Sequence, residues 1–214
     1  MSSSMSSGEV NEESCIFFVC DIQERFRPAI SHFNEIVETA SRLLKASKIL
    51  NIPVIVTEQY PEKLGSTVKE LDISHVPPEN VIPKQDFTML TEEVKQRLRD
   101  MPTRNTVVLF GIESHICVEQ TAVHLRQEGY SVHVVADGSS SRSPEDRLLA
   151  YERHRQYGCL VTTHETVLFW LLKSNKHPNF KEVQKLILKP NKPTGVVDPR
   201  LWTVHSLRSE NNAE

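Results

Sequence analysis

A carboxylate, an amine and a thiol stand at places in the sequence where a reaction centre is expected. Asp21, Lys84 and Cys117 each follow a short apolar segment of the kind that forms a buried strand. A thiol attacks a carbonyl carbon only as the thiolate, which a nearby ammonium group or a helix N-terminus favours, while a carboxylate accepts the thiol proton. The three side chains together would supply a nucleophile, a base and electrostatic support.

Each of these residues also has an ordinary structural explanation. A carboxylate after a strand often caps a turn, a lysine is usually solvated, and a cysteine in a reducing compartment is more often inert packing. Because all three residues follow apolar segments, the catalytic and the structural interpretations are both open on spacing alone.

The apolar pattern predicts the strands that would position these residues. Short runs that are rich in β-branched and aromatic residues, without alternation, are typical of strands covered on both faces. Such runs occupy residues 15–20, 53–57, 106–110 and 132–136, and shorter strands are predicted at 81–83 and 160–162.

Helical periodicity fills most of the segments between these strands. One apolar stripe runs through 35–50 and another through 117–128, and Ser143 followed by Pro144 is a typical helix start. Further helices are predicted at 91–100, 164–174 and 179–189. This alternation predicts a three-layer α/β/α fold with a parallel sheet of about six strands. The three polar residues would meet at the carboxyl edge of that sheet, where ligands bind in open α/β folds.

A length of 214 residues is compatible with one domain that has polar ends. We expect a loose tail at 1–14, a folded domain at 15–190, and a C-terminal extension and tail at 191–214.

Charge and composition argue against several classes of partner. The 25 Lys and Arg residues against 28 Asp and Glu residues give a formal charge of -3, which does not favour nucleic-acid binding. Lys181, Lys185 and Lys189 share a spacing of four, but apolar residues on the same helix indicate an ordinary solvated lysine face. No apolar run approaches the ~20 residues that span a bilayer, so no membrane partner is expected. The sequence also lacks the glycine motifs that bind nucleotides, and no cofactor is predicted.

The four cysteines form no CxxC pair, and the first residues lack the basic start and apolar core of a secretory signal. We therefore expect a cytoplasmic protein with reduced thiols, although the mitochondrion and the nucleus stay open.

Three segments resemble the motifs of the isochorismatase-like cysteine hydrolases. The segment VCDIQERF at 19–26 resembles the D-x-Q-x-x-F signature, Pro83-Lys84 resembles the lysine site, and GIESHICVEQTA at 111–122 resembles the nucleophile segment G-x5-C-V-x-x-T-A. The resemblance covers roughly residues 14 to 175, in the same order and spacing, and is strongest to the animal proteins called isochorismatase domain-containing.

The resemblance implies a set of roles for these motifs. Cys117 would be the nucleophile, Asp21 the general base and Lys84 the charge that holds both. The peptide bond between Ile112 and Glu113 would be cis, and the amides of Glu113 and Cys117 would form the oxyanion hole. The fold would have strand order 3-2-1-4-5-6, so the chain must bring Lys84 inward from a distant strand.

The resemblance also suggests the walls of the pocket and the class of substrate. Phe26 would line the pocket, and Tyr60 is a weaker candidate. Nicotinamidases carry an Asp-x-His metal motif after the second strand, whereas this chain has TEQYPE at 57–62, so we predict no metal. The expected activity is hydrolysis of a small amide or enol ether with no assigned natural substrate. The alternative is a non-enzymatic binding or interaction protein of the same fold.

An apolar stretch late in the sequence bears on assembly. Residues 168–172 read LFWLL, which exceeds what one helix face needs for a core. A homo-oligomer and a fully buried helix both explain this stretch, and we expect the oligomer.

Overall fold

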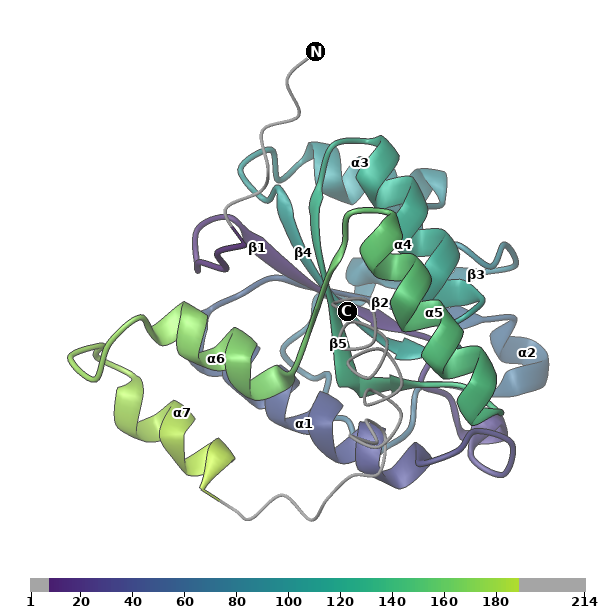
Figure 1. Ribbon diagram of the computed structural model, residues 1–214, viewed down its shortest axis with the longest axis horizontal. Helices are drawn as coiled ribbons and strands as arrows, with labels where there is room; N and C mark the ends of the chain where they lie inside the picture. Colours follow the sequence, from purple (N-terminus) through teal and green to yellow (C-terminus); the bar gives the residue numbers. More distant parts are fainter. Residues whose placement is uncertain (1–7, 189–214) are drawn as a thin grey trace, which may run out of the picture.

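The computed structural model describes residues 8–188, which are built around a six-stranded parallel sheet (Figure 1). The strand order is β3-β2-β1-β4-β5-β6, as the family resemblance implied. The strands are β1 (Cys15–Cys20), β2 (Val54–Gln59), β3 (Val81–Lys84), β4 (Thr106–Ile112), β5 (Ser131–Ser140) and β6 (Leu160–Thr162).

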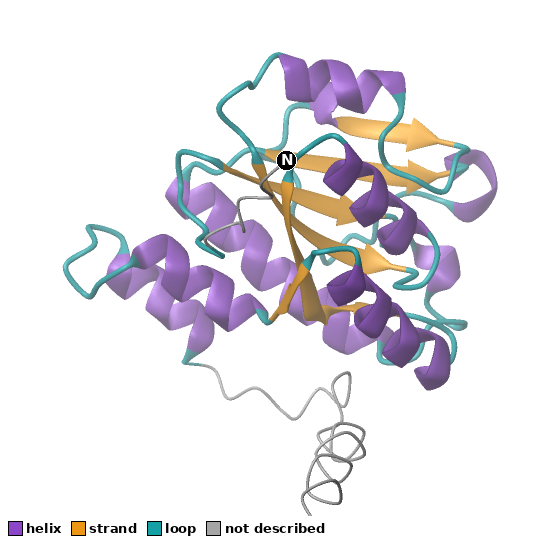
Figure 2. Ribbon diagram, turned by 45° about the horizontal axis from the view of Figure 1, so that its top comes forward, coloured by secondary structure: helices purple, strands orange, loops and turns teal. Residues whose placement is uncertain are grey.

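Helices cover both faces of the sheet, which confirms the predicted three-layer architecture (Figures 1 and 2). One layer contains α1 (Phe33–Leu50), α6 (His164–Leu172) and α7 (Phe180–Ile187), and the other contains α3 (Glu92–Arg99), α4 (Cys117–Gln127) and α5 (Pro144–Gln156). Short pieces complete the described chain: η1 (Glu24–Phe26), α2 (Pro61–Leu64) and η2 (Pro78–Asn80). Within residues 8–188, no helix is both long and apolar enough to cross a membrane.

The first strand explains why the strand sequences do not alternate between apolar and polar residues. Phe17 and Val19 belong to the hydrophobic cluster beneath α1, whereas Ile16, Phe18 and Cys20 belong to the cluster beneath α4. All five side chains are fully buried, because successive residues of a strand point to opposite faces and both faces are covered here. This alternation directs Cys20 to the same side of the sheet as α4.

Most of the predicted elements are present, with shifted ends. The strand predicted at 132–136 continues to Ser140, because the chain passes an irregularity and pairs again with the end of β4. The N-cap predicted at Ser143 is confirmed, since its hydroxyl oxygen accepts a hydrogen bond from the amide of Asp146 at 3.1 Å. The helix predicted at 179–189 spans Phe180–Ile187, and Lys189 lies outside the described residues.

The expected tail before residue 15 is wrong for residues 8–14. Val10 is fully buried in the cluster beneath α1, and the side chain of Asn11 accepts hydrogen bonds from the amides of Glu13 and Ser14. One apolar side chain and a side-chain-stabilised turn thus join this polar segment to the domain. Residues 1–7 and the segment 191–214 lie outside the described residues.

Two buried histidines should make the fold sensitive to acid. Burial lowers the pKa of His133 in β5 and of His154 in α5 from 6.5 to about 4. A depressed pKa means that their contribution to stability is complete above pH 6.5 and is lost as the pH falls toward 4, at roughly 3 kcal/mol for each. We expect the variant His133→Leu to show a shallower loss of unfolding free energy between pH 7 and pH 4.5 than the unmodified protein in urea titrations. Parallel pH profiles for the two proteins would contradict this assignment.

Candidate active site

A buried ion pair lies at the carboxyl edge of the sheet. The ammonium of Lys84 is 2.7 Å from Oδ2 of Asp21, and the side chains are 0% and 1% exposed. Buried charges persist in proteins when they are paired and hydrogen-bonded, so this pair must be organised by its neighbours. Two of the three residues that the sequence singled out are therefore in direct contact.

The register of the sheet explains how Lys84 reaches Asp21 from two strands away. Lys84 pairs with Gln59 on β2, and Thr57, two residues earlier on β2, pairs with Cys20 at the end of β1. The side chain of Lys84 therefore extends past the end of β2 toward the residue that follows β1. Its ammonium also donates to Oε1 of Gln59 at 2.6 Å and to the carbonyl oxygens of Asp86 and Phe87 at 3.0 and 3.1 Å.

Asp21 leaves the strand with a positive φ of 53° and is held from both sides. Its Oδ1 accepts a hydrogen bond from the hydroxyl of Thr57 at 2.8 Å, and its Oδ2 faces Lys84. The Cys20 thiol donates a longer hydrogen bond to Oδ2 at 3.6 Å. Both oxygens of the carboxylate thus have fixed partners, which sets the direction of the group.

Cys117 is the first residue of α4 and is 8% exposed. The residue before it, Ile116, supplies no side-chain cap, and the first-turn amide of Val118 is instead bonded to the carbonyl oxygen of Glu113 at 3.2 Å. Such a helix end favours negative charge nearby. The hydroxyl of Thr121 donates to the carbonyl oxygen of Cys117 at 2.6 Å and accepts from the amide of Met89 at 2.8 Å, which ties the chain after β3 to this helix turn.

Cys117 also lies beside the other groups of the site. Burial, and after it the neighbouring Cys117 thiol, raise the pKa of Cys20 well above 9.0. Burial opposes the charge of Lys84, but its interactions with Cys20, Asp21 and Cys117 outweigh that effect and raise its pKa above 10.5. The three side chains predicted from the sequence therefore form one cluster, with Cys20 as an additional member.

A glycine at the end of β4 permits this close approach. Gly111 pairs with Cys20 and has a φ of +132°, and a Cβ atom placed on it would lie 2.1 Å from the carbonyl oxygen of Cys20. Only glycine fits such a conformation and contact. Gly111 thus allows the chain that leads to Cys117 to pass directly against the end of β1.

The segment between β4 and α4 has the expected backbone form. The peptide bond between Ile112 and Glu113 is cis, and the carbonyl oxygen of Glu113 accepts hydrogen bonds from the amides of Ile116 and Val118. The side chain of Glu113 turns to Arg142, whose backbone amide and Nε both donate to Oε2 at 3.2 Å. Glu113 is therefore an anchor for the chain after β5.

The remaining thiols are poor nucleophiles. Burial raises the pKa of Cys15 to about 12 and that of Cys159 to about 11. All four cysteines are free and buried. Cys117 differs from Cys15 and Cys159 in its position at a helix N-terminus beside a lysine and an aspartate.

The two predicted pocket residues lie near the same edge. Phe26 in η1 is partly buried against the cluster beneath α1. The backbone amide of Tyr60 donates to the carbonyl oxygen of Lys84 at 2.8 Å. Tyr60 is 37% exposed, and the centre of its ring lies 5.0 Å from the ammonium of Lys63. The backbone of Tyr60 is thus joined to the site, while its side chain lies at the surface.

His115 is directed away from a role as a partner of Cys117. Its Nδ1 lies 2.9 Å from the hydroxyl of Ser141, and its Nε2 lies 3.8 Å from a carboxylate oxygen of Asp146. These contacts place His115 in the loop before α4, where it supports the neighbouring chain.

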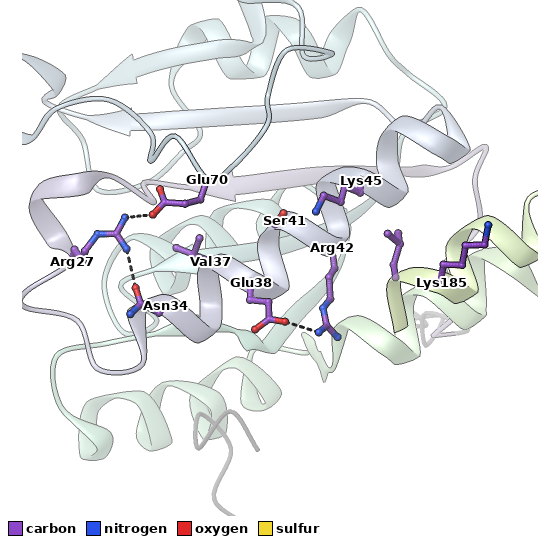
Figure 3. Close-up of a pocket in the computed structure, with 10 residues that line it drawn as sticks. Arg27, Asn34, Val37, Glu38, Ser41, Arg42, Lys45, Glu70 and Lys185 are labelled. Atoms are coloured by element: carbon purple, nitrogen blue, oxygen red, sulfur yellow. Dashed lines mark hydrogen bonds and ion pairs between the residues drawn. The ribbon is translucent and has the colours of Figure 1, made fainter. Parts of the chain in front are cut away.

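A separate groove is lined by residues of α1 and α7 and contains none of the four side chains of the cluster (Figure 3). It contains several basic side chains, but its arginines are paired with neighbours. Arg27 contacts Glu70 and Asn34, and Arg42 contacts Glu38. The groove is therefore not a bare cationic surface.

Sequence reasoning assigned no role to three residues that organise the site, although one of them, Gln23, lies in the D-x-Q-x-x-F segment. Thr57 and Gln59 face Asp21 and Lys84 from β2, and Gln23 clamps the end of that strand. Gln23 donates to the carbonyl oxygens of Gln59 and Gly65 and accepts from the amide of Gln59. The signal was present in the spacing of Thr57 and Gln59, which are two apart at the end of a strand and so share a face.

The site and the fold together define a family. The family model described as Isochorismatase domain matches residues 15–166, which include Asp21, Lys84 and Cys117. The chain therefore belongs to the isochorismatase family.

Particular relatives are similar over most of the chain. Isochorismatase domain-containing protein 2 of Xenopus laevis is 48% identical over 197 residues, which are 92% of this chain and 95% of the relative. Isochorismatase domain-containing protein 1 of Danio rerio is 47% identical over 180 residues, which are 84% of this chain, and this chain spans only 63% of that relative's length. Among solved structures, MAR1 ribonuclease from Caenorhabditis elegans is 42% identical, with a TM-score of 0.83, and the match covers 89% of this chain and 98% of that chain.

Proposed function

We propose that the protein is a metal-independent cysteine hydrolase of a small molecule that contains an amide or an enol ether. The observation that carries this proposal is the buried Asp21–Lys84 pair beside Cys117, which is the first residue of a helix. A base, a cation and a helix dipole around one thiol are the conditions that activate a cysteine nucleophile. Membership of the isochorismatase family supports hydrolase activity in general.

For an amide, the proposed reaction has two stages. Asp21 accepts the thiol proton, Cys117 Sγ bonds to the carbonyl carbon, and the amides of Glu113 and Cys117 stabilise the oxyanion. The carbon–nitrogen bond then breaks and the leaving amine takes the proton from Asp21, which leaves a thioester. Asp21 next removes a proton from water, whose oxygen bonds to the thioester carbon and displaces the sulfur. Asp21 then gives that proton to the sulfur, so the carboxylic acid product is released and the free thiol is regenerated. For an enol ether, Cys117 need not become acylated.

The residues at the end of β2 support the metal-independent assignment. Thr57 and Gln59 are engaged with Asp21 and Lys84, and Glu58 accepts hydrogen bonds from the amide and hydroxyl of Thr67 at 2.6 and 2.8 Å. The side chains at the end of β2 are thus hydrogen-bonded to Asp21, Lys84 and Thr67, and we propose that they support the site through these contacts and not as metal ligands. We assign Phe26 and Tyr60 to the walls of the substrate pocket on the same proposal.

Selective reaction of Cys117 with an alkylating agent tests this proposal without knowledge of the substrate. Iodoacetamide should label Cys117 at least about tenfold faster than Cys159 at pH 7.5, because burial keeps Cys159 as the thiol. Peptide mass spectrometry after brief labelling of the native protein gives the two rates. The urea-unfolded protein is the control, in which the two residues should react at similar rates. Equal rates in the native protein would favour the non-enzymatic alternative.

RNA hydrolysis is a second candidate, because the Caenorhabditis elegans relative is described as a ribonuclease. The basic groove between α1 and α7 would be the natural RNA surface. However, its arginines form ion pairs with Glu38 and Glu70, and the whole chain has a formal net charge of -3. We therefore favour a small-molecule substrate and no nucleic-acid partner. Cleavage of RNA that depends on Cys117 would reverse this preference.

We infer that copies of the chain associate through α6. Leu168, Leu171 and Leu172 are buried in the core, whereas Phe169 and Trp170 are 45% and 43% exposed. Two adjacent large aromatic side chains at the surface are typical of an interface.

We also propose that the protein is located in the cytoplasm. All four cysteines are free, which fits a reducing compartment.

A further inference from the structure

The ammonium of Lys84 has four oxygen neighbours, of which only one carries a charge. Asp21 supplies the carboxylate oxygen, Asp86 and Phe87 supply backbone carbonyl oxygens, and Gln59 supplies a side-chain amide oxygen. The Gln59 contact is the shortest of the four at 2.6 Å. Gln59 is therefore the one neutral side chain that holds the ammonium.

The orientation of the Gln59 amide is fixed by its other contacts. Its Nε2 donates to the carbonyl oxygen of Gln85 at 2.8 Å, which leaves Oε1 to face Lys84. The side chain of Gln23 makes two hydrogen bonds to the backbone of Gln59: its Oε1 accepts from the amide at 2.7 Å, and its Nε2 donates to the carbonyl oxygen at 3.0 Å. The side chain is thus preorganised as an acceptor for Lys84.

The charge of the site follows from these contacts. Asp21 and Lys84 sum to zero, so the cluster carries one net negative charge when the Cys117 proton has left it for solvent, and no net charge when Asp21 holds that proton. A second carboxylate on Lys84 would make the cluster negative before the thiol ionises and would oppose ionisation. The neutral amide avoids that penalty while it keeps the ammonium in place.

We propose that Gln59 is a positioning residue that holds Lys84 beside Cys117 without neutralising it, and so sets the pH at which the thiol becomes a nucleophile. The inference rests on the proposed function, because it takes Cys117 to be the reactive thiol. No contact between Gln59 and substrate is required.

Other titratable groups near Cys117 are either part of the cluster or engaged elsewhere. Cys20 lies on β1 and keeps its proton at neutral pH, because burial raises its pKa well above 9.0. Glu113 faces Arg142, and Glu119 of α4 is bound to Arg153 of α5. His124 of α4 faces the hydroxyl of Thr88 at 3.1 Å. Asp21 and Lys84 are therefore the charges through which Gln59 acts.

The test is the pH dependence of Cys117 alkylation by iodoacetamide, measured from pH 5 to pH 10 by peptide mass spectrometry. In Gln59→Glu, which is nearly isosteric, the midpoint of the rate profile should move upward by at least about one pH unit, so that labelling at neutral pH slows about tenfold. In Gln59→Met, which removes the acceptor for Lys84 and the donor to Gln85 without adding a charge, the midpoint should move upward by less than in Gln59→Glu. Gln127→Glu, at an exposed position near the far end of α4, adds the same charge and should leave the profile unchanged.

The outcomes separate this inference from the proposed function. Superimposable profiles for the unmodified protein, Gln59→Glu and Gln59→Met, with unchanged far-UV circular dichroism, would overturn the role of Gln59 alone. An equal shift in Gln127→Glu would also overturn it, because the effect would then be one of general charge. If Gln59→Glu does not fold, the Gln59→Met profile decides, and identity with the unmodified protein counts against the inference. Failure of Cys117 to label faster than Cys159 in the unmodified protein would instead reject the hydrolase.

Discussion

Replacement of Cys117 by alanine is expected to lower turnover of any small amide by at least about a thousandfold, because the covalent route then has no nucleophile. The fold should survive, since the side chain is small and the remaining site keeps the Asp21–Lys84 pair. The measurement is a mass-spectrometric screen of small amides and enol ethers, followed by steady-state rates for each hit. The matched control is Cys159→Ala, which removes another buried thiol far from the ion pair and should keep full activity.

The same variant distinguishes the two substrate classes. An amide substrate should produce a transient increase in the mass of the unmodified protein, located on the peptide that contains Cys117, and no increase in Cys117→Ala. An enol ether hydrolysed without acylation should produce neither. A hit whose rate is unchanged in Cys117→Ala would show that its turnover does not use this thiol, and such a result for every hit would end the cysteine mechanism.

The strands and helices were predictable because their signals are local. The β1 segment is apolar at every position, and both of its faces are covered by helices. The N-cap at Ser143 needed only its own residue and the proline after it. Val10 was missed because a single apolar residue in a polar segment carries no periodic signal, although it is fully buried. The strand end at Ser140 was missed because its pairing with Ile112 follows a register shift between β4 and β5.

The candidate site likewise contains residues that the sequence predicts and contacts that it does not predict. Asp21 and Lys84 could be selected because they are reactive types at strand ends, and Cys117 because it begins the helix that follows a strand; the motif resemblance joined the three. The supporting contacts of Thr57 and Gln59 depend on register, since Gln59 reaches Lys84 only because those two residues are paired on adjacent strands. Register between strands that are far apart in the sequence is a tertiary property and has no signature in either strand alone.

Lys84→Met should destabilise the fold by about 3–5 kcal/mol, because it leaves the carboxylate of Asp21 buried without its counter-charge. After the change, Asp21 retains the Thr57 hydroxyl and the longer contact with the Cys20 thiol. Two such neutral donors do not replace an ammonium for a group that is 1% exposed. The free energy of unfolding from urea titrations at pH 7 measures the loss.

Removal of the other charge of the pair, in Asp21→Asn, is expected to lower the free energy of unfolding by less. In Asp21→Asn, Lys84 keeps three oxygen acceptors, from Gln59 and from the backbone of Asp86 and Phe87. An ammonium group has three protons to donate, so its hydrogen-bonding capacity stays filled although its counter-charge is lost. Lys84→Met should therefore be the more destabilising of the two single variants, and the opposite order would contradict the assigned contacts.

The double variant Asp21→Asn with Lys84→Met should recover much of the loss caused by Lys84→Met alone, since no unpaired charge then remains buried. Lys95→Met is the surface control. The ammonium of Lys95 lies 3.4 Å from Glu128 and 3.7 Å from Glu92, its side chain is 32% exposed, and the ion pairs should contribute less than about 1 kcal/mol. Additive losses in the double variant would mean that Asp21 and Lys84 do not act as a pair. Because the proposed chemistry requires the same contact, that result would remove the electrostatic support for Cys117 as well.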